Sequence, residues 1–160
     1  METILALCIG LGLSAACGFR IFVPMLGLSL AAHTGHVSLA SDFRWLGSDV
    51  ALTALGVATA LEIGAYYVPW LDHFLDTLAT PASVVAGTMV TASVMTDMSP
   101  FLRWTLAVIA GGGVAAAVQT TTVVTRAAST LATGGLANPL VASAELGGAL
   151  TATALSLAAP

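Results

Sequence analysis

The sequence predicts an all-α, polytopic membrane protein of about five transmembrane helices. Of its 160 residues, 58% are hydrophobic and 8% are charged, whereas about 25% are charged in an ordinary soluble domain. A chain surrounded by lipid needs apolar residues outside as well as inside, and this composition provides them. Long apolar stretches also follow one another with only short polar loops between them. We therefore expect a single transmembrane domain covering residues 1–160.

Five stretches approach the length of a membrane-spanning helix, which is roughly 20 mostly apolar residues. They cover about residues 3–32, 50–68, 81–95, 101–131 and 139–158. Residues 69–80 combine aromatic and acidic side chains, which is typical of a short amphipathic helix at the membrane surface. We therefore divide the chain into a first half of about 3–68, a connector of about 69–100, and a second half of about 101–158.

An internal repeat relates the first apolar stretch to the fourth. A shift of 101 residues places Gly10 on Gly111, together with several neighbouring small and apolar residues. A second, shorter match places Glu62 on Glu145. An odd number of membrane crossings separates the members of each pair. The pattern therefore predicts an inverted-topology repeat that relates spans 1–2 to spans 4–5.

Both long stretches contain a predicted break or kink. In the first, Gly18 and Pro24 flank Arg20, and Pro24 cannot donate a hydrogen bond to a helix carbonyl. In the fourth, a polar run extends from Gln119 to Thr122. About 30 residues at about 1.5 Å each reach about 45 Å, beyond the roughly 30 Å hydrocarbon core, so each helix must tilt or break. Matched interruptions in a repeat indicate a binding site near the membrane midplane.

Arg20 is the leading candidate for a functional charge. An arginine in a membrane helix costs at least about 2.5–3.5 kcal/mol and requires a partner. Glu62 and Glu145 are the candidate partners because each lies within an apolar helix. The three residues predict a polar pocket that binds an ion or a small solute. A buried ion pair that only fixes the helix register is the other interpretation.

Four further polar residues are candidates for binding the same solute or ion. Asp72 and Asp76 lie one helical turn apart, so their carboxylates share a face and could hold a cation. Asp72 would equally suit the first turn of a helix that starts at Pro69. Gln119 belongs to the predicted interruption of the fourth stretch. Asn138 precedes a proline, and the pair is typical of a helix cap.

The sequence predicts neither an enzyme nor a cofactor site, and it leaves metal binding open. It contains no metalloprotease, serine-hydrolase or phosphate-loop motif. Nucleic-acid binding requires clustered cations, but the chain has four arginines, no lysine and no basic cluster. Cys8 and Cys17 lie in an apolar run and are expected to act as small hydrophobic residues.

Several short motifs follow one another along the chain: residues 18–24, Leu61 with Glu62, residues 66–69, residues 71–76, Thr80 with Pro81, Ala86 with Gly87, Asn138 with Pro139, Ser143 and Glu145. Taken in this order, they resemble the bacterial and plastid membrane-protein family called domain of unknown function 4126. The resemblance covers nearly the whole chain and implies no established activity. It implies that most of the candidate residues recur in the family's motifs: Arg20, Pro24, Glu62, Asp72, Asp76, Asn138 and Glu145.

We therefore predict a small inverted-repeat transporter or channel for an ion or a small solute, with Arg20, Glu62 and Glu145 lining its site. Five thin helices leave little room for a sealed pathway within one subunit. We accordingly expect a homo-oligomer, with a dimer favoured, in the lipid bilayer of the bacterial inner membrane. The alternative is a non-transporting scaffold or a subunit of a larger membrane complex, in which these charges only pair.

Overall fold

The computed structural model is built from helices and turns, and its described backbone, residues 2–158, contains no strand. Side chains are described for residues 3–68 and 77–158. The elements are α1 (Glu2–Phe19), α2 (Phe22–His33), the 3₁₀ helix η1 (Ser41–Gly47), α3 (Asp49–Ala65), α4 (Pro69–Val94), α5 (Pro100–Leu106), the π-helix η2 (Ala107–Gly112), α6 (Gly113–Thr133) and α7 (Asn138–Ala158).

Among the described residues, three helical segments are long and apolar enough to cross a membrane. They are Thr77–Val94 within α4, the continuous segment Pro100–Thr133, and α7. Helices η1 and α3 meet at a bend of 65° and provide a fourth candidate if they count as one span. Helices α1 and α2 are shorter apolar helices. The all-helical, membrane-type fold is thus confirmed, with three or four candidate spans in place of five.

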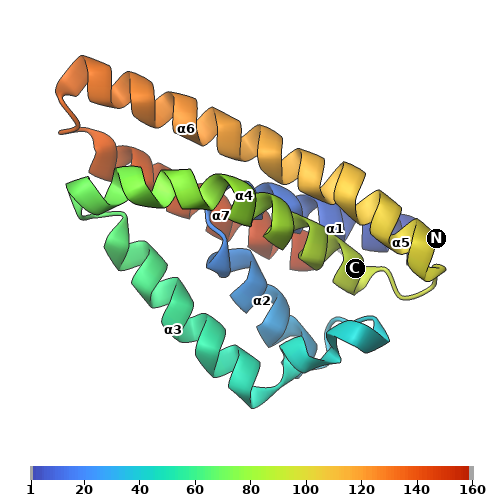
Figure 1. Cartoon of the computed structure of the whole chain (residues 1–160). Helices are drawn as coiled ribbons and strands as arrows, with labels where there is room; N and C mark the ends of the chain where they lie inside the picture. Colours follow the sequence, from blue (N-terminus) through green and yellow to red (C-terminus); the bar gives the residue numbers. More distant parts are fainter. Residues whose placement is uncertain (1, 159–160) are drawn as a thin grey trace.

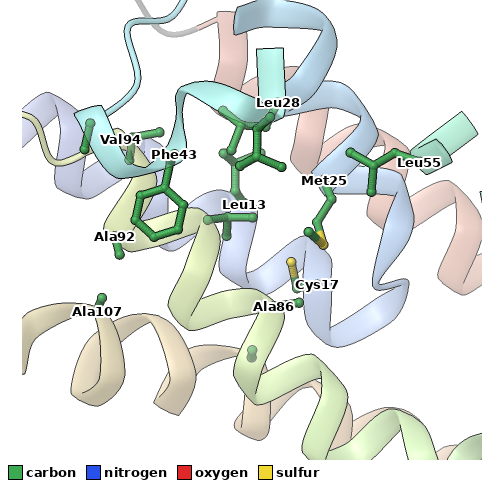
Figure 2. Packing of buried hydrophobic residues seen from close by; sticks show 14 residues of the cluster. Leu13, Cys17, Met25, Leu28, Phe43, Leu55, Ala86, Ala92, Val94 and Ala107 are labelled. Carbon is green, nitrogen blue, oxygen red and sulfur yellow. The ribbon is translucent and has the colours of Figure 1, made fainter. Parts of the chain in front are cut away.

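The first apolar stretch is a helical hairpin, not a single kinked span. Helices α1 and α2 are separated by Arg20 and Ile21 and run in opposite directions (Figure 1). In the core, Leu13 lies beside Leu28 and Cys17 lies beside Met25, as expected for two helices that fold back on each other (Figure 2).

The predicted break is therefore present, but its cause differs from the prediction. Pro24 lies in the first turn of α2, where a backbone N–H has no helical partner in any case. Gly18 lies within α1 and allows a close approach to α6, since an added Cβ would lie 2.8 Å from the carbonyl oxygen of Ala115. Neither residue kinks a continuous helix.

Helix α1 packs against α4 through small residues. Ser14 Oγ donates a hydrogen bond of 2.7 Å to the Gly87 carbonyl, and Thr91 Oγ1 donates one of 3.1 Å to the Gly10 carbonyl. Small side chains let the two backbones approach closely enough for these bonds. The contacts pair later residues of α1 with earlier residues of α4, so the two helices are antiparallel.

The segment η2–α6 packs against α4 at the same two positions. An added Cβ on Gly111 would lie 2.7 Å from the Gly87 carbonyl oxygen and would also meet Thr91. Four residues later, the side chain of Ala115 lies over Gly87. Helix α6 is therefore antiparallel to α4 as well, and α1, α4 and α6 each pack against the other two.

These directions do not confirm the predicted inverted topology. Helices α1 and α6 run in the same direction, although the 101-residue shift places Gly10 on Gly111 (Figure 1). The prediction counted residues 3–32 as one crossing, and the α1–α2 hairpin adds a reversal of the chain. Helices α3 and α7, which contain Glu62 and Glu145, run in opposite directions (Figure 1). One symmetry axis therefore cannot relate both matched pairs.

The fourth apolar stretch is continuous at the predicted interruption, and that prediction is wrong. Helix α6 is regular from Gly113 to Thr133, and the only irregular section between Pro100 and Thr133 is the π-helix η2. The hydroxyls of Thr120 and Thr121 donate to carbonyls four residues earlier. A polar run satisfied in this way does not require a break in the helix.

Residues 69–80 do not form a separate surface helix. They are the first half of α4, which continues through Pro81 to Val94. The predicted connector therefore contains the helix that packs against both α1 and α6. Asp72 and Asp76 belong to this half of α4, but their side chains lie outside the described residues.

Replacing Gly111 by alanine should lower the apparent melting temperature of the protein in detergent. The new Cβ would lie 2.7 Å from the carbonyl oxygen of Gly87, and overpacking of this kind costs about 1–3 kcal/mol. Gly113 has nothing within 4 Å of an added Cβ, so Gly113→Ala should be neutral or gain up to about 1 kcal/mol from helix propensity. Thermal unfolding followed by circular dichroism compares the variants, and equal melting temperatures would contradict the close α4–η2 contact.

Candidate functional site

Arg20 lies at the tip of the α1–α2 hairpin and is only 2% exposed. Its Nη2 donates to the Ala142 carbonyl at 2.9 Å and lies 3.4 Å from Glu145 Oε2. The guanidinium carbon lies 3.7 Å from the centroid of the Tyr66 ring. Its Nε and Nη1 make no hydrogen bond to the described residues. The expected burial and pairing of Arg20 are therefore confirmed, with Glu145 as the partner.

A second arginine, Arg126 of α6, shares the same carboxylate. Arg126 Nε donates to Glu145 Oε1 at 2.9 Å, and Arg126 Nη2 donates to Oε2 in a bidentate arrangement. The guanidinium carbon of Arg126 lies 4.4 Å from the centroid of the Tyr66 ring. Arg126 is 3% exposed and Glu145 6%. Two cations, one carboxylate and one aromatic ring are thus enclosed together, and Arg20, Arg126, Glu145 and Tyr66 are called the charge cluster below.

Arg126 is not among the site residues predicted from sequence, although the sequence carries a signal for it. Gln119, Thr122 and Arg126 are spaced by three and four residues and are all buried on one face of α6. A polar stripe of this spacing in an apolar helix predicts a face turned toward other helices. Gln119 lies two turns from Arg126, about 10 Å along the helix, and no contact brings it into the charge cluster.

Glu62 has a different role from that of Glu145. Its Oε1 accepts a hydrogen bond of 2.7 Å from the Ile21 backbone N–H, and its Oε2 accepts one of 3.1 Å from that of Phe22. These groups lie at the N-terminus of α2, where no helical carbonyl can reach them. A carboxylate at this position is favoured by the two hydrogen bonds and by the helix dipole. Glu62 of α3 therefore caps the hairpin beside Arg20 without a direct ion pair to it.

Two grooves adjoin these groups. One of about 460 Å³ lies between α2, α3 and α4, with Glu62 and Tyr66 in its lining. Its other lining residues are apolar: Ile21, Phe22, Ala58, Leu61, Ala65, Leu78, Ala79 and Ala82. A second groove of about 520 Å³ lies between α4 and α6. Its polar lining is Arg126, Thr77, Thr80 and Thr130, and its apolar lining is Val123, Ala127 and Leu131.

The remaining candidates are less closely tied to the charge cluster. Asn138 is the first residue of α7 and is buried, with its Nδ2 3.1 Å from Thr130 Oγ1 of α6. This contact joins the two helices at their turn. The side chains of Asp72 and Asp76 lie outside the described residues. The described side chains contain no group of three or more His, Cys, Asp or Glu residues able to hold a metal ion.

This fold and site define a helical, membrane-type protein with buried arginine–glutamate ion pairs. The family model described as Domain of unknown function (DUF4126) matches residues 7–160, nearly the whole chain. The chain belongs to this family, as its motifs predicted. No curated protein and no solved structure matches it.

Replacing Glu145 by glutamine should destabilise the protein by about 3–5 kcal/mol, because two buried guanidiniums would lose their carboxylate. The Asp42–Arg103 pair provides a matched control. Asp42 Oδ2 lies 2.5 Å from Arg103 Nη2, but the Asp42 side chain is 63% exposed. Arg103 is itself only 6% exposed, but water can reach the exposed side of this pair, so Asp42→Asn should cost less stability than Glu145→Gln. Unfolding of both variants in one detergent tests the comparison, and equal losses would mean that burial does not set the strength of the Glu145 pair.

Proposed function

We propose that this chain is a small membrane transporter or channel for an ion or a small solute, and not an enzyme. The charge cluster forms the polar part of its pathway. The observation that supports this function best is the position of the cluster between two grooves. Glu62 and Tyr66 line one of these grooves, and Arg126 lines the other.

The energetic cost of the charge cluster supports the proposal. Buried ions are costly to remove from water, and well-packed apolar residues often replace a buried ion pair with no loss of stability. Arg20 also keeps two buried donor groups that no described residue uses. In transporters, helices that end within the membrane direct their termini at the bound ion or solute. The N-terminus of α2, at the tip of the hairpin, fits that description.

The alternative function is a scaffold or a subunit of a larger membrane complex. The bidentate Arg126–Glu145 pair favours it, because such a pair can serve only to hold α6 and α7 in register. The two functions differ in whether the charge cluster is accessible to a solute. A measurement of flux therefore separates them.

We further propose that the protein acts as a homo-oligomer in the bacterial inner membrane. A stripe of small residues on α3 supports this, since an added Cβ on Gly56 or Gly64 would have no described atom within 4 Å. Stripes of this kind allow two membrane helices to pack closely. The same helix forms one wall of the groove that contains Glu62.

Replacing Arg20 by glutamine should abolish most transport while the protein stays folded. Glu145 keeps Arg126 as its partner in this variant, so no buried carboxylate is left unpaired. The loss of a charged hydrogen bond of about 1.5–3 kcal/mol should lower the flux at least about tenfold. The measurement is flux of a panel of ions and metabolites into proteoliposomes, with folding checked by size-exclusion chromatography.

The matched control for this experiment is Arg44→Gln, because Arg44 is exposed in η1. Its flux should equal that of the unchanged protein. Undiminished flux in Arg20→Gln would remove Arg20 from the pathway. An absence of flux in the unchanged protein across the whole panel would favour the scaffold.

A further inference from the structure

Glu62 and Glu145 differ in how strongly their surroundings hold the carboxylate in its ionised form. Glu145 accepts two hydrogen bonds from Arg126 and pairs with Arg20, so a proton on it would leave two buried cations uncompensated. Glu62 receives no hydrogen bond from a guanidinium. Its partners are two backbone N–H groups, and it is only half-buried in the lining of a groove. Of the two, Glu62 is the carboxylate that can exchange a proton.

We propose that Glu62 is the proton-binding site of this protein, and that its protonation releases α3 from the tip of the α1–α2 hairpin. The inference rests on the proposed transport function in one respect, since it names the proton as the coupling ion. The site itself and the movement of α3 can be measured without a known solute.

The chemistry of the groove favours a proton over a metal cation. A metal ion such as Mg²⁺ or Ca²⁺ requires about six or more oxygen ligands. Glu62 provides the only carboxylate among the described residues of this groove, and its other described lining is apolar except for Tyr66. A proton needs only one carboxylate oxygen.

Protonation would weaken the contact between α2 and α3 directly. The ionised carboxylate accepts one hydrogen bond through each oxygen, from Ile21 and from Phe22. A proton placed on the oxygen that faces Phe22 turns it into a hydroxyl, which accepts that bond poorly and no longer neutralises the helix N-terminus. The proton comes from a hydronium ion of the acidified solution: its O–H bond breaks as the O–H bond of the carboxylic acid forms, and a water molecule is left.

Helix α3 is free to respond because most of its packing is against α2 and η1. Helices α3 and α4 meet at their shared turn and form the two sides of a V, with α2 between them (Figure 1). The groove that contains Glu62 lies between these sides. Weakening the bonds to Ile21 and Phe22 would therefore widen the groove next to the charge cluster.

The charged and titratable groups around Glu62 come from every neighbouring helix. Cys17, in the last turn of α1, and Arg20, just after that helix, are the titratable groups on this side. Tyr66 follows Glu62 by four residues, and Arg126 of α6 lies against the Tyr66 ring, paired with Glu145 of α7.

On α2 and α4, the described side chains that line this groove are apolar. Asp72 and Asp76 of α4 lie outside the described side chains, so a test must separate Glu62 from these two residues. Glutamine at position 62 provides that separation, because it stays neutral at every pH.

Infrared spectroscopy of the protein in nanodiscs tests the proton site. Acidification from about pH 8 to about pH 5, which covers the titration of perturbed carboxyls, should produce a carboxylic-acid C=O band in the unchanged protein. Glu62→Gln should lack that band, and Glu62→Asp should retain one. A band that persists in Glu62→Gln, or no band in the unchanged protein, would overturn the proposal.

Spin-label distances test the movement of α3. Labels on Ala60→Cys and Val85→Cys report the width of the groove, since both positions are exposed on α3 and α4. The exposed Cys8 is replaced by serine, and Cys17 is buried. Acidification should add a longer-distance population when Glu62 is present. Glu62→Gln should show that population at both pH values, and a pH-dependent distance in Glu62→Gln would assign the proton to another residue and overturn the proposal.

The outcomes also separate this inference from the proposed transport function. A carboxyl band and a moving α3, without flux of any solute, would support the proton site and contradict transport. Flux that is lost in Arg20→Gln but does not vary with pH, together with no carboxyl band, would support transport and overturn the proton site.

Discussion

A helix that begins inside an apolar bundle leaves backbone N–H groups that neither water nor lipid can satisfy. The reversal of the chain at Arg20 and Ile21 leaves such N–H groups at the start of α2. Much of the remaining structure depends on which groups accept their hydrogen bonds. Glu62 of α3 accepts these hydrogen bonds. They hold α3, which has little other packing, against the hairpin. The same reversal places the Arg20 side chain against α7, where Glu145 is available.

Charge balance connects the capped hairpin to the charge cluster. The described charged groups around the hairpin tip are two arginines and two glutamates, so their formal charges sum to zero. Loss of the charge on either glutamate would leave the set with a net positive charge. Glu145 lies between Arg20 and Arg126, while Glu62 balances the set from the N-terminus of α2. The Tyr66 ring makes a cation–π contact with both guanidiniums. These contacts compensate part of the hydration that the guanidiniums lose on burial. A change in the charge of one carboxylate therefore alters the field at both arginines.

The features that were predictable from sequence are those that depend on local composition or on the cost of a buried charge. Helices α3 and α7 begin and end within three residues of the predicted bounds of 50–68 and 139–158, and Arg20 pairs with Glu145 because no lone guanidinium persists in an apolar core. Hydropathy carries no information about direction, so it could not reveal that the chain reverses after Phe19. The reversal then changed the parity on which the inverted repeat depended. Arg126 was missed because it lies near the end of an apolar stretch, and that position alone does not indicate its role. Its role follows from the buried face of α6 on which it lies.

The π-helix η2 has a consequence for how sequences of this kind can vary in length. Buried positions recur every four residues along this segment: Arg103, Ala107, Gly111, Ala115 and Gln119. In an ordinary α-helix each four-residue step overshoots a full turn by about 40°, so four steps would rotate the buried face by about 160°. The wider turns of η2 absorb part of that rotation and keep Arg103 and Gln119 facing the other helices. A homologue one residue shorter here could form an ordinary α-helix throughout: 15 steps of about 100° end only about 60° past whole turns, so its two ends would still share a buried face, and η2 accommodates the extra residue.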